Sequence, residues 1–285
     1  MKPLVGITQG IFTSYPIVNI MKVKGQLRKM THEDADPIEY FLSLDEKPVP
    51  INPEVGREVS LKFLNKITCI ECGRSIKKTY DQGYCFPCAR DLPENAMCAV
   101  RPEKCEHEFG NEQDQEFFQK YCKVDHLVYL SLTSGVKVGV TRHWNIPSRW
   151  IDQGAVQGLV IARTPERKLS GRIEVALAEH MADKTNWRKM LKGEVESVNL
   201  QEYRQTVRQW FPKDLKPYFL EGEAVQELHY PVDAVPDKIV SHNLDKEPRF
   251  RDRLIGIKGQ YLIFEHRVIN LRKYAGYHVE FETFK

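Results

Sequence analysis

The sequence contains no long apolar run and no secretion signal. No window approaches the length that a transmembrane helix needs, and Met1–Gly6 lacks both an apolar stretch and an Ala-x-Ala-like cleavage site. A formal net charge of only +3 says little about partners. We therefore expect a soluble, cytoplasmic protein that does not enter a membrane.

Cysteine is too sparse for a disulfide-rich secreted domain. The 285 residues include seven cysteines, and four of them have the spacing of a zinc site, which points to a reducing compartment. The length allows about two domains. A content of 41% hydrophobic and 28% charged residues is typical of a globular protein with a sizeable core.

Two Cys-x2-Cys pairs organise the chain. Cys69 and Cys72 are separated by twelve residues from Cys85 and Cys88. Four thiolates brought to one point suit the tetrahedral coordination of Zn²⁺, and the turn-forming segment 81–83 can return the second pair to the first. The spacing predicts a structural zinc ion in a zinc-ribbon-like insert. A redox pair or two disulfides is the alternative.

Further zinc donors follow this block. Cys98, Cys105, His107 and Cys122 come next, with His126 just beyond. Cysteine and histidine both bind zinc, so these residues offer a second site, although their spacing is irregular. Three buried thiols without a metal are the alternative.

The pattern of apolar residues predicts an α+β protein in four parts. We expect two β-rich regions that can pack together, residues 1–64 and 221–285. Between them we expect the zinc-binding module, residues 65–125, and a small α/β core, residues 126–220. We expect no chemistry in the first region, whose proline-rich segment 46–56 reads as a loop. In the last region, Leu254–Phe264, Val268–Leu271 and Tyr277–Phe284 have a strand-like composition.

The core begins with a predicted hairpin formed by His126–Leu132 and Val136–Thr141. A short helix, Ser148–Gln153, should end at Gly154, Ser170 can cap the next long helix, and a further helix should start after Asn199. Between Leu127 and Leu220 the sequence holds 15 Lys and Arg against 9 Asp and Glu, a net charge of 15 − 9 = +6. This excess fits a nucleic-acid surface, or simply a solvated face.

The core resembles the GIY-YIG nuclease superfamily. The residues that carry the resemblance are Leu127–Tyr129 on the first strand, Lys137–Gly139 on the second, Arg149 on the following helix, Glu174 on a later helix, and Asn186 twelve residues further on. The resemblance implies a GIY-YIG-like fold for 126–220 and a metal-dependent phosphodiesterase activity on nucleic acid.

The resemblance also assigns roles. Glu174 would hold Mg²⁺ or Mn²⁺, Arg149 would stabilise charge on the phosphate, and Tyr129 would orient or activate the nucleophile. Lys137 stands where the superfamily has its second tyrosine, and Leu127 replaces the glycine of the first motif. A lysine can bind phosphate but is a poor base unless it is buried.

Each of these residues also has a purely structural interpretation. Tyr129 could be a core aromatic residue, Arg149 could pair with Asp152, Glu174 could be an exposed helix residue, and Lys137 could be solvated.

Most of the chain is also similar to a bacterial family classed only as a domain of unknown function. The matching stretches are Gly25–Met30, Cys69–Cys88, Pro102–Cys105, Gly139–Ala155 and Gly256–Tyr261. This resemblance supports a second metal site, with Cys98, Cys105, His107 and Cys122 as the best four donors and His126 in reserve.

Three functional hypotheses follow. The leading one is a zinc-containing nucleic-acid-binding protein with a divergent nuclease core, either active or non-cleaving. The second is a protein-interaction adapter built on structural zinc modules. The third is a redox or zinc sensor that uses Cys98, Cys105 and Cys122.

Overall fold

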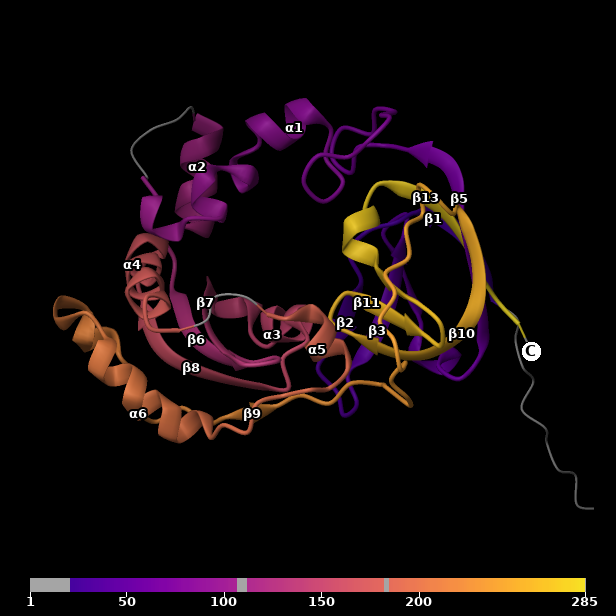
Figure 1. Cartoon of the computed structure of the whole chain (residues 1–285). Coiled ribbons are helices and arrows are strands. Elements are labelled where there is room, and N and C mark those ends of the chain that lie inside the picture. The colour runs from indigo at the N-terminus through magenta and orange to yellow at the C-terminus, as the bar shows by residue number, and fades with distance from the viewer. Residues whose placement is uncertain (1–20, 107–111, 182–184, 285) are drawn as a thin grey trace, which may run out of the picture.

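The computed structural model describes residues 21–106, 112–181 and 185–284, and these form the predicted α+β fold. The strands are arranged in three sheets of six, three and four strands. Figure 1 shows the β-rich region on one side, the central sheet with its helices on the other, and the cysteine-bearing segment above them. None of the helices in these ranges is long and apolar enough to cross a bilayer.

The six-stranded antiparallel sheet combines both ends of the chain. Its order is β1 (Lys22–Gln26), β13 (Tyr277–Thr283), β5 (Glu58–Ile67), β10 (Arg249–Lys258), β11 (Tyr261–Phe264) and β12 (Val268–Asn270). The strand-like composition of Leu254–Phe264 is confirmed, and this stretch contributes to both β10 and β11. Gly259 adopts a positive φ of 61° and turns the chain back, so the apolar run supplies two paired strands instead of one.

A second sheet contains β2 (Thr31–Glu33), β3 (Glu39–Leu44) and β4 (Lys47–Pro50). The loop predicted for 46–56 is therefore partly wrong, because it includes β4 and a 3-10 turn, Asn52–Glu54. β4 pairs with β3 alone, so Pro48 and Pro50 occupy an edge strand, where a missing N–H is tolerated.

The central sheet has the order β7 (Val136–Arg142), β6 (His126–Leu132), β8 (Gln157–Thr164) and β9 (Gln226–Glu227). The predicted hairpin is confirmed, with Tyr129 opposite Gly139. Alternate residues such as Val128 and Leu130 face a core with Ile173 of α4 (Arg167–Ala178). α6 (Leu200–Trp210) packs in the same core and begins at the capping residue Asn199, as predicted.

The helix predicted to be capped by Ser170 begins four residues earlier. Glu166 occupies the N-cap position, and the Ser170 hydroxyl, now inside α4, donates a hydrogen bond of 2.7 Å to the Arg167 carbonyl. Serine makes such bonds to the preceding turn as readily as it caps a helix, so its presence alone does not fix the boundary.

Between β5 and β6 the chain forms the cysteine segment. It contains α1 (Phe86–Asp91), α2 (Glu112–Tyr121) and the 3-10 turns Pro93–Asn95, Met97–Ala99 and Pro102–Lys104. The last turn packs on α4 at Gly171, where an added Cβ would lie 2.2 Å from the backbone nitrogen of Glu103. Only glycine allows this close approach.

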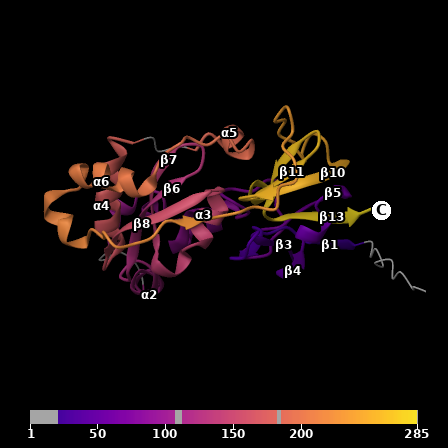
Figure 2. The same ribbon diagram turned by 90° about the horizontal axis from the view of Figure 1, so that it is seen from below.

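The short helix α3 (Ser148–Gln153) joins the central sheet to the β-rich region (Figure 2). It ends at Gly154 with a φ of 71°, as predicted. Trp150 and Ile151 are buried in the same core as residues of the β-rich region. α5 (Trp187–Leu191) makes a second junction, since Met190 and Leu191 pack with Ile263 and Val268. α3 and α5 therefore both connect the central region to the β-rich region.

Candidate active site and metal centres

The four cysteines of the two Cys-x2-Cys pairs converge on one point. Their sulfur atoms all lie within 4.8 Å of one another, and Cys72 Sγ is 3.7 Å from Cys85 Sγ. Four thiolates around a zinc ion at about 2.3 Å would be separated by about 3.8 Å. The site therefore has the size of a four-cysteine zinc centre and could hold a zinc ion.

Local backbone structure shapes this site. After β5, Gly73 turns with a φ of 70°, and the Cys69 N–H donates to the Arg74 carbonyl at 2.9 Å. The second pair lies at the start of α1, where the Cys85 N–H donates to Cys69 Sγ at 3.2 Å. Burial alone would raise the pKa of Cys69, but this and other backbone N–H groups lower it to about 6, which favours the thiolate.

Three further cysteines form a second cluster. The sulfur atoms of Cys98, Cys105 and Cys122 lie within 4.8 Å of one another, and all three residues are buried. Hydrogen bonds from the other two thiols lower the pKa of Cys98 to about 3. Three sulfur donors at this distance could hold a metal ion with one further ligand.

A tetrahedral metal ion at these three sulfur atoms needs a fourth donor. The predicted ligand His107 lies outside the described residues. The reserve donor His126 is buried, and its Nε2 has no hydrogen-bond partner among the described residues, while its Nδ1 lies 2.7 Å from the Val124 carbonyl. Its nitrogen atoms do not belong to the group of donors that lie within 4.8 Å of one another.

Two of the residues predicted from the nuclease resemblance line a cleft of about 570 Å³. Its walls come from the cysteine segment, from β7, α3 and α4, and from the 3-10 turn Leu271–Tyr274, and they include Arg149 and Glu174. Tyr129 and Lys137 lie close enough to Arg149 and Glu174 for these charges to influence their pKa values. Four of the five predicted catalytic residues are therefore brought together.

Tyr129 is fully buried and held on three sides. Its ring contacts Trp150 edge to face with centroids 5.9 Å apart, and Gln153 Nε2 donates to its hydroxyl at 3.1 Å. An added Cβ on Gly139 would lie 2.5 Å from that hydroxyl, so the glycine makes room for the ring. Burial raises the pKa of Tyr129, while the charge of Arg149 and a hydrogen bond from it act in the opposite direction.

Arg149, Glu174 and Lys137 are half-buried, and burial shifts the pKa values of Glu174 and Lys137. Burial raises the pKa of Glu174 to about 7, against the attraction of Arg149. Burial also lowers the pKa of Lys137 to about 8, assisted by Arg149 and opposed by Glu174. Among the described residues, none of these three groups forms an ion pair. Half-buried, unpaired charges are costly in a folded protein and are typical of functional sites.

Asn186 does not join this group. Its side chain caps α5 by accepting the N–H groups of Arg188 and Lys189, and it does not line the cleft. Arg149 does not pair with Asp152 either. Asp152 instead bonds Lys29 and His32, the latter at 3.3 Å, and accepts a hydrogen bond of 2.9 Å from Gln260.

Sequence reasoning missed the residues that hold Arg149 in place. Asp152 lies one helical turn beyond Arg149, so its bonds to Lys29 and Gln260 fix α3 against the β-rich region. Gln260 also bonds both the N–H and the carbonyl of Met30, at 2.9 and 3.1 Å. All of these residues lie in the stretches that match the family classed as a domain of unknown function. That match is the signal in the sequence that could have pointed to them.

Comparison with known proteins identifies a family. No curated protein and no solved structure matches the chain. A family model described as protein of unknown function (DUF2797) matches residues 56–279, which cover the cysteine segment, the cleft and most of the β-rich region. This chain therefore belongs to the DUF2797 family.

Proposed function

We propose that this protein is a zinc-containing, nucleic-acid-binding phosphodiesterase with a divergent GIY-YIG-like core and a divalent metal ion at Glu174. The observation that carries the proposal is that Arg149 and Glu174 line one cleft and that their charges act on the adjacent side chains of the buried Tyr129 and the half-buried Lys137. Their order along the chain, first strand, second strand, following helix and later helix, is the one that the resemblance implies.

The side chains suit phosphodiester cleavage. The Glu174 carboxylate, which has no ion-pair partner among described residues, is available to hold Mg²⁺ or Mn²⁺. When bound, such an ion polarises the phosphate and lowers the pKa of a bound water. The Arg149 guanidinium would neutralise charge that develops on the phosphate oxygens, an effect that is strongest in a half-buried site.

Lys137 provides a base at the position where the superfamily has a tyrosine. Its lowered pKa, about 8, leaves a useful fraction of neutral amine near neutral pH, and that amine would accept the proton of the attacking water. The buried Tyr129 hydroxyl, between Arg149 and Gln153, would orient the nucleophile. The replacement of tyrosine by lysine is therefore compatible with catalysis.

The cysteine centres have a structural role in this proposal. Zinc at Cys69, Cys72, Cys85 and Cys88 would fold the segment that supplies Gln82 and Tyr84 to one wall of the cleft. A zinc ion at Cys98, Cys105 and Cys122 would order the wall that contains Pro102. None of the seven cysteines is in a disulfide, which favours a reducing, cytoplasmic location.

The proposal is tested by incubating purified protein with single- and double-stranded DNA and RNA, with and without Mg²⁺ or Mn²⁺. We expect metal-dependent cutting that falls at least about 100-fold in Arg149→Ala. Arg208→Ala is the matched control, because Arg208 is exposed on α6 and pairs with Glu221 outside the cleft. Salt-sensitive binding without cutting would mean that the surface is retained and the chemistry is lost.

A protein-interaction adapter is the second candidate. Eight large hydrophobic side chains are exposed among the described residues, and four of them, Tyr80, Phe86, Met97 and Val100, lie in the cysteine segment. Phe86 and Val100 are 53% and 85% exposed. Exposed apolar groups next to zinc sites favour a protein partner. Absence of both nucleic-acid binding and cutting would make this candidate the better one.

A further inference from the structure

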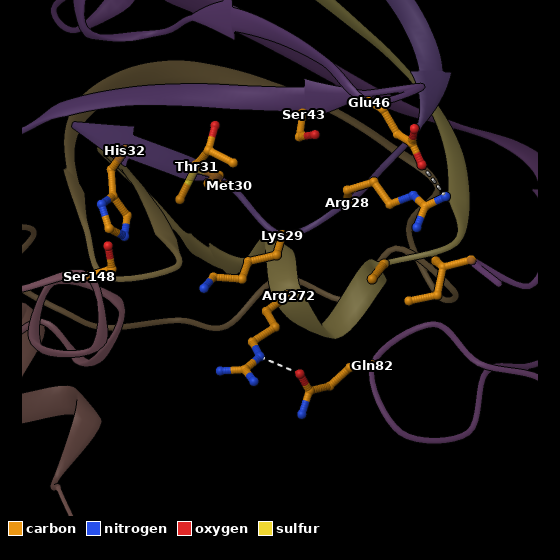
Figure 3. A pocket seen from close by; sticks show the side chains of 12 residues that line it. Arg28, Lys29, Met30, Thr31, His32, Ser43, Glu46, Gln82, Ser148 and Arg272 are labelled. Atoms are coloured by element: carbon orange, nitrogen blue, oxygen red, sulfur yellow. Dashed lines mark hydrogen bonds and ion pairs between the residues drawn. The ribbon is translucent and has the colours of Figure 1, made fainter. Parts of the chain in front are cut away.

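A second cavity of about 500 Å³ adjoins the catalytic cleft (Figure 3). It lies between the segment Arg28–His32, the part of the cysteine segment that contains Ile70 and Gln82, and the 3-10 turn that contains Arg272. We call it the Arg28 pocket. Gln82 and Arg272 line both cavities, so one molecule can extend from the cleft into the pocket. Its volume falls within the range of about 300–1,000 Å³ typical of ligand sites.

The pocket is positively charged, and one of its cations, Arg272, has no ion-pair partner among the described residues. Arg28, Lys29 and Arg272 line it, against a single described carboxylate, Glu46. Lys29 is committed to Asp152. Arg272 bonds only the neutral Gln82 side chain and forms no ion pair with the described residues. Arg28 forms an ion pair of 3.1 Å with the exposed Glu46, which a phosphate could displace, and its buried Nε has no hydrogen-bond partner in the described part of the chain.

The wall of the pocket is held rigidly. Gln260 fixes the Met30 backbone through two hydrogen bonds, and the buried Asp152 holds both Lys29 and His32. Asp152 belongs to α3, the helix that carries Arg149. The pocket and the catalytic arginine are therefore positioned by one network, as expected for parts of one binding site.

We propose that the Arg28 pocket receives one unpaired nucleotide of a single-stranded nucleic acid whose neighbouring phosphate lies at Arg149 and Glu174. Arg272 would contact one phosphate directly, Arg28 would exchange the exposed Glu46 for a second phosphate, and the partly exposed Ile70 offers an apolar surface to the base. A base enters such a pocket only after it leaves the helical stack, so the substrate class is single-stranded nucleic acid or an unpaired end. This inference rests on the proposed function.

The test measures binding by fluorescence anisotropy without divalent metal, so that no cutting occurs. The probes are a 12-nucleotide single strand and the same sequence in a duplex. We expect the single strand to bind at least tenfold more tightly. Arg28→Gln should weaken that binding about five- to tenfold and reduce the slope of log K against log salt by about 0.7, the value for one phosphate contact.

Lys273→Gln is the matched control, because Lys273 is an exposed neighbour of Arg272 that does not line the pocket. It should bind like the wild type, and thermal unfolding should show that both variants fold. A strand with one 5-iodouracil should crosslink to the peptide that contains Ile70. A free nucleoside monophosphate should bind at least a hundredfold more weakly than the strand.

The outcomes separate this inference from the proposed function. Loss of binding in Arg28→Gln in a protein that never cuts would support the pocket and refute the phosphodiesterase. A protein that cuts, but whose Arg28→Gln variant binds like the wild type, would overturn the pocket alone. Equal affinity for the duplex, or a nucleoside monophosphate that binds as tightly as the strand, would also overturn it.

Discussion

Glu174→Gln should make the protein more stable while it removes the proposed metal ligand. Glu174 is half-buried among unpaired charges, and burial raises its pKa from 4.5 to about 7. At pH 8 the folded state must therefore carry a carboxylate in a position that disfavours its charge. Glutamine has nearly the same shape and no charge, so it relieves this cost.

The magnitude follows from linkage between protonation and folding. A rise of about 2.5 units in pKa corresponds to an upper bound of about 3 kcal/mol, which we reduce to about 1–3 kcal/mol for solvent screening. Because the pKa is raised in the folded state, the wild type loses stability as pH rises from 4.5 to about 7. The advantage of Glu174→Gln should thus be full at pH 8 and less than half as large at pH 5.

Thermal unfolding of zinc-loaded protein, without added Mg²⁺ or Mn²⁺ and without chelator, measures this difference. For a chain of this size we expect a Tm increase of about 2–10 °C at pH 8. Glu179→Gln, an exposed change at the end of the same helix, should leave Tm within about 1 °C. A Glu174→Gln variant that is no more stable at pH 8, or equally stabilised at both pH values, would refute the reasoning.

Three further predictions concern the scaffold. Cys72→Ala should lose one zinc equivalent per chain by elemental analysis and lower Tm, whereas an unchanged zinc content would exclude the four-cysteine centre. Gly139→Ala should cost about 1–3 kcal/mol by displacing Tyr129, while Gly222→Ala, which meets nothing within 4 Å, should be nearly neutral in denaturant unfolding. Asp152→Asn should cost about 1–2 kcal/mol in denaturant unfolding, because Lys29 and His32 lose their charged partner; an unchanged stability would contradict the network.

Local signals predicted the elements whose ends are fixed by local chemistry. The helix Ser148–Gln153 was found because Gly154 ends it in a left-handed conformation. Asn199 marked α6 for a similar reason. Local signals did not decide between two competing outcomes: an apolar run around Gly259 can be one strand or a hairpin, and prolines can occupy a loop or an edge strand.

The candidate site was predicted in part because the resemblance linked residues that lie far apart in the chain. Tyr129, Arg149 and Glu174 carry no shared periodicity, so composition and spacing alone would not have grouped them. The contacts that hold the site could not be found in this way. Lys29 and Asp152 are 123 residues apart, and Gln260 is 108 residues from Asp152. No local pattern encodes such a contact, which only the folded chain creates.

The central claim is that Glu174 holds a divalent metal ion that is needed to cut nucleic acid. It is tested most directly by single-turnover cleavage across a Mg²⁺ titration, with wild type, Glu174→Gln and Glu179→Gln purified identically. The account predicts metal-dependent cutting by the wild type and Glu179→Gln, and a rate at least about 100-fold lower in Glu174→Gln with unchanged affinity for nucleic acid. Equal rates in all three proteins, or no cutting by the wild type at any metal concentration, would contradict it.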